Sequence, residues 1–440
     1  MTRVGGSIAI TGGFVVPVEG EPIEGGTVVI TDGTITAVAG PDFTPPAGAT
    51  RVDATGKWVL PGFIDAHTHL GAREEGEGWA GHDTNELTGP VQAHVRVLDA
   101  INPADEGFRD ALAGGVLAAG ITPGSGNPIG GQTVAVRCWG LTVDDMVLRS
   151  PAGMKSALGE NPKRVVGERR VNPSSRLGTA AAIRSALVDA AAYVAREEDQ
   201  RLSDPSIERT GAPAGPGGRP PQASASMGGS RPPFPPAPPD KSGGGRDLKL
   251  EALARVLRRE IPWRQHCHRA DDIATALRLA AEFGYDLVLD HCTEGYLLVD
   301  KIAAAGVPVV TGPLITARSK VELRNRTLAN PGILAAAGIT VAIATDHPVV
   351  PVHLLILQAA LAVREGMDRD AALRAVTINP AKIMRVADRI GSLVPGKDAD
   401  LVIWSGDPFD LMSRAEVAYI AGREVYRYDS ASRSGVFASP

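Results

Sequence analysis

Two pairs of histidines, each pair interrupted by a single residue, are the chemically most informative feature of this sequence. His67 and His69 follow the apolar start of PGFIDAHTHLG, and His266 and His268 lie in IPWRQHCHRADDI. Because side chains alternate between the two faces of a strand, both members of each pair point the same way. Imidazole nitrogens are common ligands of divalent metal ions, so each pair could supply two ligands to one ion.

Two further strand-like segments end in residues that could complete such a site. His291 lies at the end of the strand in YDLVLDHCTEG, and Asp346 lies at the end of the strand in ITVAIATDHP. Cys267 lies between His266 and His268, and Cys292 follows His291. Alternation turns both thiols away from the ligands, and we expect them to be packed as small buried side chains. Imidazole nitrogen with carboxylate oxygen and no thiolate suits zinc, manganese or iron(II), and zinc is the metal that we expect.

The elements that must position these residues alternate between strand-like and helical segments. Strands are predicted in WVLPGFIDAHTH, YDLVLDHC, GVPVVTG and ITVAIATDH, and helices in TAAAIRSALVDAAAYVAREED, DLKLEALARVLRRE and ADDIATALRLAAEF. This alternation is typical of βα units around a parallel sheet. Active sites of (β/α)₈ barrels lie at the carboxyl ends of the strands, which is where the histidines and Asp346 fall. The sequence therefore predicts an α/β protein with a (β/α)₈ TIM barrel over residues 61–385.

The two ends of the chain are rich in short β-strand patterns instead. Residues 7–39 contain SIAITGGFVV and GTVVITDGTITAV, with Asp32 and Gly33 suited to a tight hairpin turn. The other end contains DADLVIWS, AEVAYIAG and REVYRY. We expect residues 1–60 and 386–440 to pair into one small β-sandwich, with the barrel inserted between them.

One segment inside the predicted barrel interrupts its pattern. Residues 203–246 are rich in Pro, Gly and Ser, a composition that buries too little apolar surface to form a packed core. We expect a flexible surface insertion, which is either a plain loop between two helices or a lid over the active site.

Composition and charge exclude several classes of protein. The net charge of -5 offers no basic surface for nucleic acid, and no uncharged apolar run approaches the roughly 18 residues that span a bilayer. Three scattered cysteines are too few for a disulfide framework, and the N-terminus carries no apolar signal region. The sequence thus predicts a cytoplasmic protein that acts on a small molecule, without nucleic-acid or membrane partners.

Taken together and in this order, the motifs resemble one superfamily. They are PGFIDAHTHLG, PGSGNPIGGQ, GMKSALGENPK, HCHRADDI, DHCTEG, ATDHP and the closing GSLVPGKDADLVIW. The chain looks like a member of the amidohydrolase superfamily, in the branch related to imidazolonepropionase. The resemblance runs from Ile8 to Tyr426, apart from the insertion, and it says little about the substrate.

The resemblance implies a role for each of the five residues at the strand ends. His67, His69 and Asp346 are expected to bind one metal ion. His266 and His291 are expected to bind a second ion or to position the substrate. The protein would then hold one or two divalent ions.

A two-metal site also needs a bridging carboxylate. In related enzymes the bridge is a carboxylated lysine or a glutamate, and PAGMKSALGENPK offers both, as Lys155 and Glu160. If neither residue bridges, the site holds one metal ion and His291 acts as a catalytic residue. His268 could replace His266 as the ligand, although the resemblance favours the first histidine of the pair.

The resemblance further implies the hydrolysis of a carbon–nitrogen bond in an amide or cyclic amide. Metal-bound hydroxide would attack the carbonyl carbon, because a bound metal ion lowers the pKa of water to about 7. Asp346 would take the proton from that water and pass it to the leaving nitrogen, as general base and then general acid.

Three further residues are candidates for contact with the substrate. His268 and Arg269 could bind it, for instance through a carboxylate, but Arg269 could equally form a salt bridge with Asp271 or Asp272. Gln132, in the Gly-rich segment PGSGNPIGGQ, could donate a hydrogen bond to a ligand.

Two other functions fit the same residues. A deaminase with a single metal ion would use the same fold, and a barrel without activity could serve as a binding or assembly module. Metal content separates the two enzymes, since two equivalents per chain favour the amide hydrolase and one favours the deaminase. Related enzymes commonly form dimers or larger assemblies, so a homo-oligomer is also expected.

Overall fold

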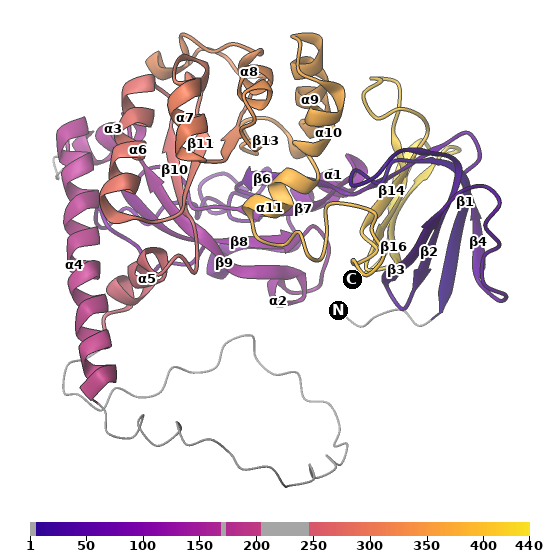
Figure 1. The fold of residues 1–440 in the computed structure, drawn as a ribbon, viewed down its shortest axis with the longest axis horizontal. Helices are drawn as coiled ribbons and strands as arrows, with labels where there is room; N and C mark the ends of the chain where they lie inside the picture. Colours follow the sequence, from indigo (N-terminus) through magenta and orange to yellow (C-terminus); the bar gives the residue numbers. More distant parts are fainter. Residues whose placement is uncertain (1–5, 169–172, 204–245) are drawn as a thin grey trace, which may run out of the picture.

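A computed structural model describes residues 6–168, 173–203 and 246–440 of the chain. Nearly all of the insertion predicted over 203–246 lies outside the described residues. Figure 1 shows two units side by side, a barrel surrounded by helices and a β-rich unit in which the first and last parts of the chain meet. This arrangement confirms the predicted barrel and the predicted pairing of the chain ends.

Eight strands form the barrel, in the order β13-β12-β11-β10-β9-β8-β7-β6. They are β6 (Phe63–Thr68), β7 (Val116–Ile121), β8 (Ile129–Arg137), β9 (Val147–Ala157), β10 (Trp263–Cys267), β11 (Leu287–His291), β12 (Val309–Thr311) and β13 (Val341–Ile343). Neighbouring strands are parallel, except that β8 is antiparallel to both β7 and β9. Residues 122–128, all of them described, lead directly from β7 to β8 without a helix. Their prolines and glycines disfavour a helix, which explains this departure from a regular βα repeat.

The first and last strands of the barrel are joined at the ends that carry the predicted ligands. Asp65 of β6 accepts hydrogen bonds from the backbone N of Thr345 at 3.0 Å and from its Oγ1 at 2.6 Å. One residue further along, the backbone N of Asp346 donates to the carbonyl of His67 at 3.1 Å. The barrel closure therefore places Asp346 beside His67 and His69.

The prediction of one continuous strand in WVLPGFIDAHTH is wrong. The segment forms two strands in two different sheets, β5 (Trp58–Pro61) in the β-rich unit and β6 in the barrel. Gly62 lies between them, packed so closely that a Cβ atom there would lie 2.5 Å from Cδ1 of Leu117. Apolar content alone cannot show where a chain crosses from one sheet to another, because both halves of the segment are buried.

The β-rich unit is a nine-stranded sheet that encloses its own apolar core. Its strands β5 and β14 pair antiparallel and so join the two chain ends. The predicted hairpin turn is confirmed, because Asp32 and Gly33 both have positive φ, 49° and 78°, as a two-residue turn of this type requires. The remaining strands are β1 (Ser7–Val15), β2 (Ile23–Thr31), β3 (Thr34–Ala39), β4 (Thr50–Asp53), β14 (Leu401–Trp404), β15 (Ala415–Ile420), β16 (Arg423–Asp429) and β17 (Ser434–Phe437).

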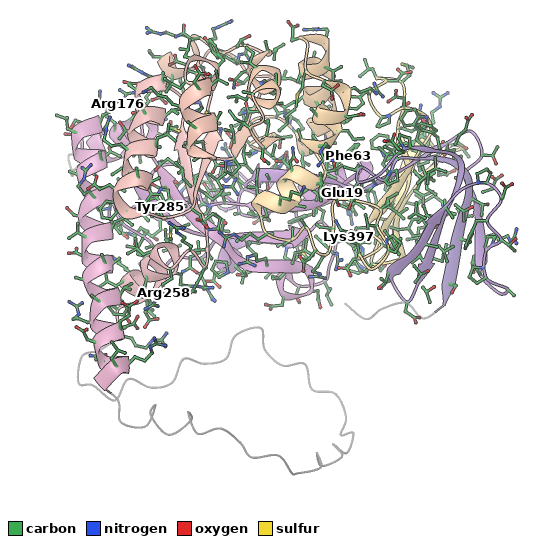
Figure 2. All side chains as sticks on the ribbon, in the orientation of Figure 1. Glu19, Phe63, Arg176, Arg258, Tyr285 and Lys397 are labelled. Carbon is green, nitrogen blue, oxygen red and sulfur yellow. The ribbon has the colours of Figure 1, made fainter. Side chains whose placement is uncertain are left out.

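Polar contacts fix the barrel against the β-rich unit. Arg137, at the end of β8, forms ion pairs with Asp398 at 2.7 Å and with Asp400 at 2.8 Å, and all three side chains are largely buried. Glu19 and Lys397, labelled in Figure 2, form an ion pair at 3.1 Å close to the same boundary. Segments almost 400 residues apart in the sequence are thus held together.

The helices lie outside the barrel, and their apolar faces pack on its strands. In α6, for example, Ile273, Ala276 and Leu279 recur every three residues and are buried, and the helix ends at Gly284 in the left-handed conformation. The helices are α1 (Glu106–Ala113), α2 (Val143–Met146), α3 (Glu160–Glu168), α4 (Arg176–Ser203), α5 (Leu248–Leu257), α6 (Ala270–Phe283), α7 (Val299–Ala305), α8 (Asn330–Ala336), α9 (Leu355–Arg364), α10 (Arg369–Arg374) and α11 (Ile378–Ile383). Single 3₁₀ turns are η1 (Val97–Ala100), η3 (Gly295–Leu297), η4 (Val321–Leu323) and η5 (Val352–Leu354).

Helix α4 stands at the edge of the barrel (Figure 1) and is the longest of the described helices. Among these helices it alone is long and apolar enough to cross a membrane, which by itself is weak evidence for a membrane span. Ion pairs connect it to its neighbours: Arg184 contacts Glu282 of α6 at 2.8 Å, and Glu197 contacts Arg258, at the end of α5, at 2.6 Å. Both pairs are at the surface, whereas the buried side chains Ile183, Leu187 and Ala190 pack α4 against the apolar core.

Candidate metal centre

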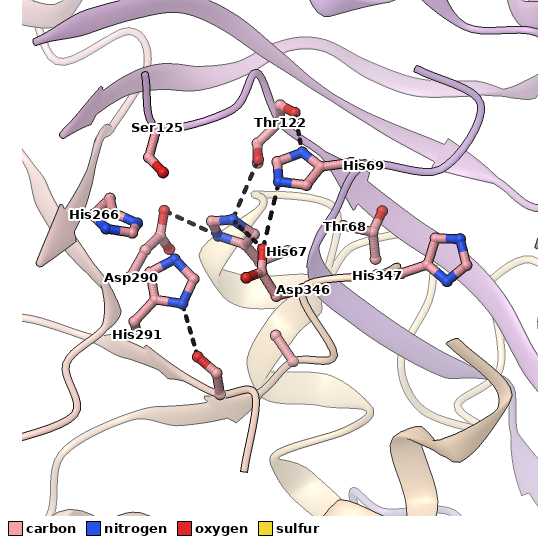
Figure 3. Close-up of polar contacts among 12 residues, drawn as sticks. His67, Thr68, His69, Thr122, Ser125, His266, Asp290, His291, Asp346 and His347 are labelled. Atoms are coloured by element: carbon pink, nitrogen blue, oxygen red, sulfur yellow. Dashed lines mark hydrogen bonds and ion pairs between the residues drawn. The ribbon is translucent and has the colours of Figure 1, made fainter. Parts of the chain in front are cut away.

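The structure brings together the five residues that the sequence places at strand ends. Their side chains meet inside the carboxyl end of the barrel, as Figure 3 shows. His67, His69 and Asp346 each offer one atom that could bind a metal ion, and these three atoms lie within 4.8 Å of one another. A second group with the same spacing consists of His266, His268 and His291.

The two groups adjoin and form one cluster. The ring centres of His67 and His291 are 4.7 Å apart, and those of His266 and His291 are 4.4 Å apart. His268 belongs to the cluster as well, with its ring centre 4.7 Å from that of His266. The sequence predicts that both histidines of this pair face the site and leaves open which of them is the ligand, and the structure places both side chains in the cluster.

Backbone carbonyls orient two of the imidazoles. Nδ1 of His69 donates a hydrogen bond to the carbonyl of Thr122 at 2.8 Å, and Nδ1 of His291 donates to the carbonyl of Gly312 at 2.7 Å. Because a carbonyl oxygen only accepts, Nδ1 carries the proton in both rings and Nε2 keeps its lone pair. Proteins usually orient a histidine ligand in this way, with the ring nitrogen that does not bind the metal donating a hydrogen bond.

The arrangement around Asp346 fits a cation. Nε2 of His67 lies 3.5 Å from Oδ1 of Asp346, and Nε2 of His69 lies 3.4 Å from the same atom. In the neutral, metal-binding form of these rings, Nε2 would present a lone pair toward this carboxylate oxygen, and a cation placed between them would be attracted by both. The donor set of imidazoles and carboxylate therefore fits a divalent metal ion.

Burial keeps the imidazoles in the neutral form that binds metal. It lowers the pKa of His67 to about 3, and it holds the pKa of His266, His268 and His291 below the usual range. Within the described residues, the buried atoms Nδ1 of His266 and Nε2 of His268 have no hydrogen-bond partner. Metal binding requires neutral histidine, so these rings are prepared for it.

Asp346 carries a negative charge at neutral pH. Burial raises the pKa of its carboxyl group, but the interactions with His69, His291 and His67 outweigh burial and hold that pKa below the usual range. Its backbone has φ of 53°, in the left-handed region that non-glycine residues seldom adopt. His291 has φ of 68°. Such local strain is concentrated at functional sites.

The two candidates for a bridging residue lie in different places. Lys155, on β9, is only 1% exposed, and its Nζ lies 3.1 Å from Nε2 of His67. Burial lowers the pKa of the Lys155 amine to about 8. Glu160 begins α3 beyond the strand, and its backbone N donates to Oε1 of Glu322 at 2.6 Å. Of the two, Lys155 is the residue in contact with the cluster.

The predicted substrate contacts differ in their surroundings. His268 lies in the cluster, as described. Arg269 instead donates to both carboxylate oxygens of Asp271 at 2.9 Å, which is the salt bridge that the sequence left as an alternative. Nε2 of Gln132 donates to the carbonyl of Ala93 at 3.3 Å.

A buried ion pair next to the cluster was not predicted from the sequence. Oδ1 of Asp290 accepts hydrogen bonds from Arg264 at 2.6 and 3.1 Å, and its Oδ2 lies 3.3 Å from Nδ1 of His67. Arg264 also donates to the carbonyl of Ala66 at 3.0 Å. Burial raises the pKa of the Asp290 carboxyl group, but the opposing effect of Arg264 and His67 is larger. The pKa therefore lies below its usual range, and the group is ionised. The available signal was a charged residue inside each of two buried strands, Arg264 in β10 and Asp290 in β11.

The substitution Arg264→Met should destabilise the protein by about 3–5 kcal/mol, because it leaves the Asp290 charge buried without its partner. Equilibrium unfolding in urea measures the change. The matched control is Arg184→Met, which breaks an exposed pair with Glu282 and should cost less than about 1 kcal/mol. Equal losses in the two variants would show that the Arg264–Asp290 pair contributes no more than a surface pair.

Comparison with known proteins agrees with this geometry. Residues 236–426 match the amidohydrolase family. Imidazolonepropionase of Rhizorhabdus wittichii is 30% identical over 424 residues, which are 91% of this chain and 92% of that protein. The amidohydrolase tasK of Hapsidospora irregularis is 27% identical over 90% of this chain, but the match spans only 39% of tasK.

Among solved structures, an amidohydrolase from Thermotoga maritima is similar over almost the entire length. Its sequence is 41% identical, the match covers 96% of this chain and 100% of that one, and the TM-score is 0.83. The similarity in sequence and in fold supports one assignment. The chain belongs to the amidohydrolase superfamily, in the branch related to imidazolonepropionase, a class of metal-dependent hydrolases that act on carbon–nitrogen bonds other than peptide bonds.

Proposed function

We propose that this protein hydrolyses an amide or cyclic amide, with two divalent metal ions, expected to be zinc, at the carboxyl end of its barrel. The observation that carries the proposal is the convergence of ligand atoms in two adjoining groups, His67, His69 and Asp346 on one side and His266, His268 and His291 on the other. Two groups of three ligands are more than one ion needs, and this favours the hydrolase over the deaminase with a single ion.

The chemistry of the proposed reaction divides between the metal and Asp346. A divalent ion held there lowers the pKa of water to about 7 and polarises a carbonyl oxygen. The Asp346 carboxylate, which is ionised at neutral pH, takes the proton from the attacking water as the bond to the carbonyl carbon forms. It then delivers this proton to the leaving nitrogen as the carbon–nitrogen bond breaks.

Lys155 is the proposed source of the bridging carboxylate. With a pKa of about 8, part of its amine is unprotonated near neutral pH and can attack carbon dioxide. That reaction forms a nitrogen–carbon bond, releases a proton and leaves a carbamate. The position of Nζ, 3.1 Å from Nε2 of His67, supports this assignment over Glu160.

The direct test removes and restores metal while hydrolysis is measured. Treatment with a chelator should lower the hydrolysis of a panel of cyclic amides and N-acyl compounds by about 10²-fold or more, and zinc should restore it. Mass spectrometry should detect one product heavier by one water from a cyclic amide, or an acid and an amine from an N-acyl compound, and metal analysis should find close to two equivalents per chain. Release of ammonia with one equivalent of metal would assign a deaminase instead, and full activity without metal would reject both.

A further inference from the structure

Helix α4 has two faces with different surroundings. One face packs against the apolar core around the barrel, where Leu187 is buried. The opposite face leaves Leu177, Val188 and Leu202 in contact with water, at 84%, 53% and 80% exposure. The helix is apolar enough to cross a membrane, yet only 28% of its most apolar stretch is buried. Exposed apolar surface that is continuous in this way marks an interaction site.

The exposed apolar residues follow the spacing of a coiled-coil seam. The residues that recur every seven positions are Ala181, Val188, Ala195 and Leu202, and Ala192 lies four residues after Val188 and three before Ala195. All five are exposed. Apolar residues at alternating intervals of three and four form one stripe along a helix, and such a stripe pairs with that of a second helix.

Two charged residues lie along one edge of this stripe. Asp189 and Arg196 are exposed and are seven residues apart, so they lie on the same side of the helix. Neither forms a hydrogen bond or an ion pair with any residue in the described part of the chain. A two-fold axis that is perpendicular to α4 and crosses it near Ala192 would bring Asp189 of each copy opposite Arg196 of the other. Charges beside a seam of this kind determine which helices pair and in which direction.

A second copy of this chain fits the exposed face better than a lipid bilayer does. Helix α4 is packed along one side against the apolar core, so lipid cannot surround it as it surrounds a spanning helix. Lipid would also leave the charges of Asp189 and Arg196 at the edge of a hydrocarbon phase without a partner. A second α4 helix covers the apolar stripe and pairs both charges.

We propose that two copies of this protein form a dimer through their α4 helices, which pair antiparallel with Ala192 at the two-fold axis. The ion pair between Asp189 and Arg196 then forms once on each side of the axis. The polar members of the face, Ser185 and Asp199, are equally far from Ala192 along the chain and lie opposite each other in this arrangement. The position of α4 at the edge of the barrel leaves room for the second copy (Figure 1).

Sedimentation velocity tests the interface, and the unmodified protein should be a dimer. Val188→Glu should raise the dissociation constant of the dimer by about 10²-fold or more, because it buries an unpaired charge in the seam. The matched control is Leu411→Glu, which makes a similar change at a position that is 79% exposed and outside α4, and it should leave the dimer unchanged. A monomeric unmodified protein would overturn the proposal, and so would a dimer that withstands Val188→Glu.

Exchange of the two charges tests the direction of the helices. Asp189→Arg and Arg196→Asp should each raise the dissociation constant by about 10-fold or more, because each places like charges opposite one another. The double variant Asp189→Arg/Arg196→Asp should return close to the unmodified value, because the pairs form again with reversed sign. Additive losses in the double variant would show that these residues do not face each other.

Cross-linking locates the axis. Under mild oxidation, Ala192→Cys should form a disulfide between two copies, whereas Leu202→Cys should not, because its two copies would lie about 30 Å apart. The three native cysteines are buried and do not compete. Cross-linking through Leu202→Cys would show a parallel pair and overturn the arrangement. Flotation of monomeric protein with phosphatidylcholine vesicles would assign the face to a membrane instead.

Discussion

The substitution Asp346→Asn should lower kcat for amide hydrolysis by about 10³-fold or more while the fold is retained, because the amide can neither accept nor deliver the proton. The variant keeps the shape of the side chain, so the hydrogen bond from its backbone N to the carbonyl of His67 should persist. Steady-state kinetics of the zinc-loaded variant measure the loss, and circular dichroism checks the fold. Retained activity would remove Asp346 from the proposed role.

Metal content distinguishes loss of proton transfer from loss of an ion. The Asp346→Asn variant would still offer an amide oxygen beside His67 and His69, so it should bind metal more weakly but reach full occupancy when zinc is in excess. Asp388→Asn is the matched control, since it makes the same change at an exposed position outside the metal centre and should leave kcat unchanged. If added zinc restores activity to the Asp346 variant, then that residue acts as a ligand alone.

The substitution Lys155→Met should remove about one of two metal equivalents and lower kcat/KM by about 10²-fold or more, because the bridging carboxylate is lost. Methionine fills a similar buried space, so the barrel should still fold. Metal analysis and steady-state kinetics measure both effects. The matched comparison is Glu160→Gln, for which kcat/KM should change by less than about 3-fold.

The chemical state of Lys155 can be tested directly as well. Protein prepared with ¹³C-labelled carbon dioxide should show a carbamate resonance, and this resonance should be absent from the Lys155→Met variant. A Lys155→Ala variant should regain part of its activity in the presence of acetate, which fits the vacated space and supplies a carboxylate. If the Glu160 variant loses metal and the Lys155 variant does not, the bridge belongs to Glu160.

Local rules were sufficient for much of this protein. The alternation of side chains on a strand predicted that His67 and His69 share a face, and that Cys267 lies away from it, buried among the helices. The tendency of barrel active sites to lie at the carboxyl ends of strands predicted that distant residues such as His291 and Asp346 would meet. The turn at Asp32 and Gly33 follows from the positive φ that its geometry requires. None of these inferences needs knowledge of which strands are neighbours.

Contacts between strands were decided only by the tertiary structure. The carbonyl of Thr122 orients His69, and Arg264 reaches Asp290, because the register of neighbouring barrel strands places these atoms together. The same is true of the antiparallel direction of β8. Backbone carbonyls carry no sequence signal, and strand register is set by packing over the entire barrel. The sequence by itself therefore determined which residues could bind metal, whereas the closed barrel decided their partners, protonation and surroundings.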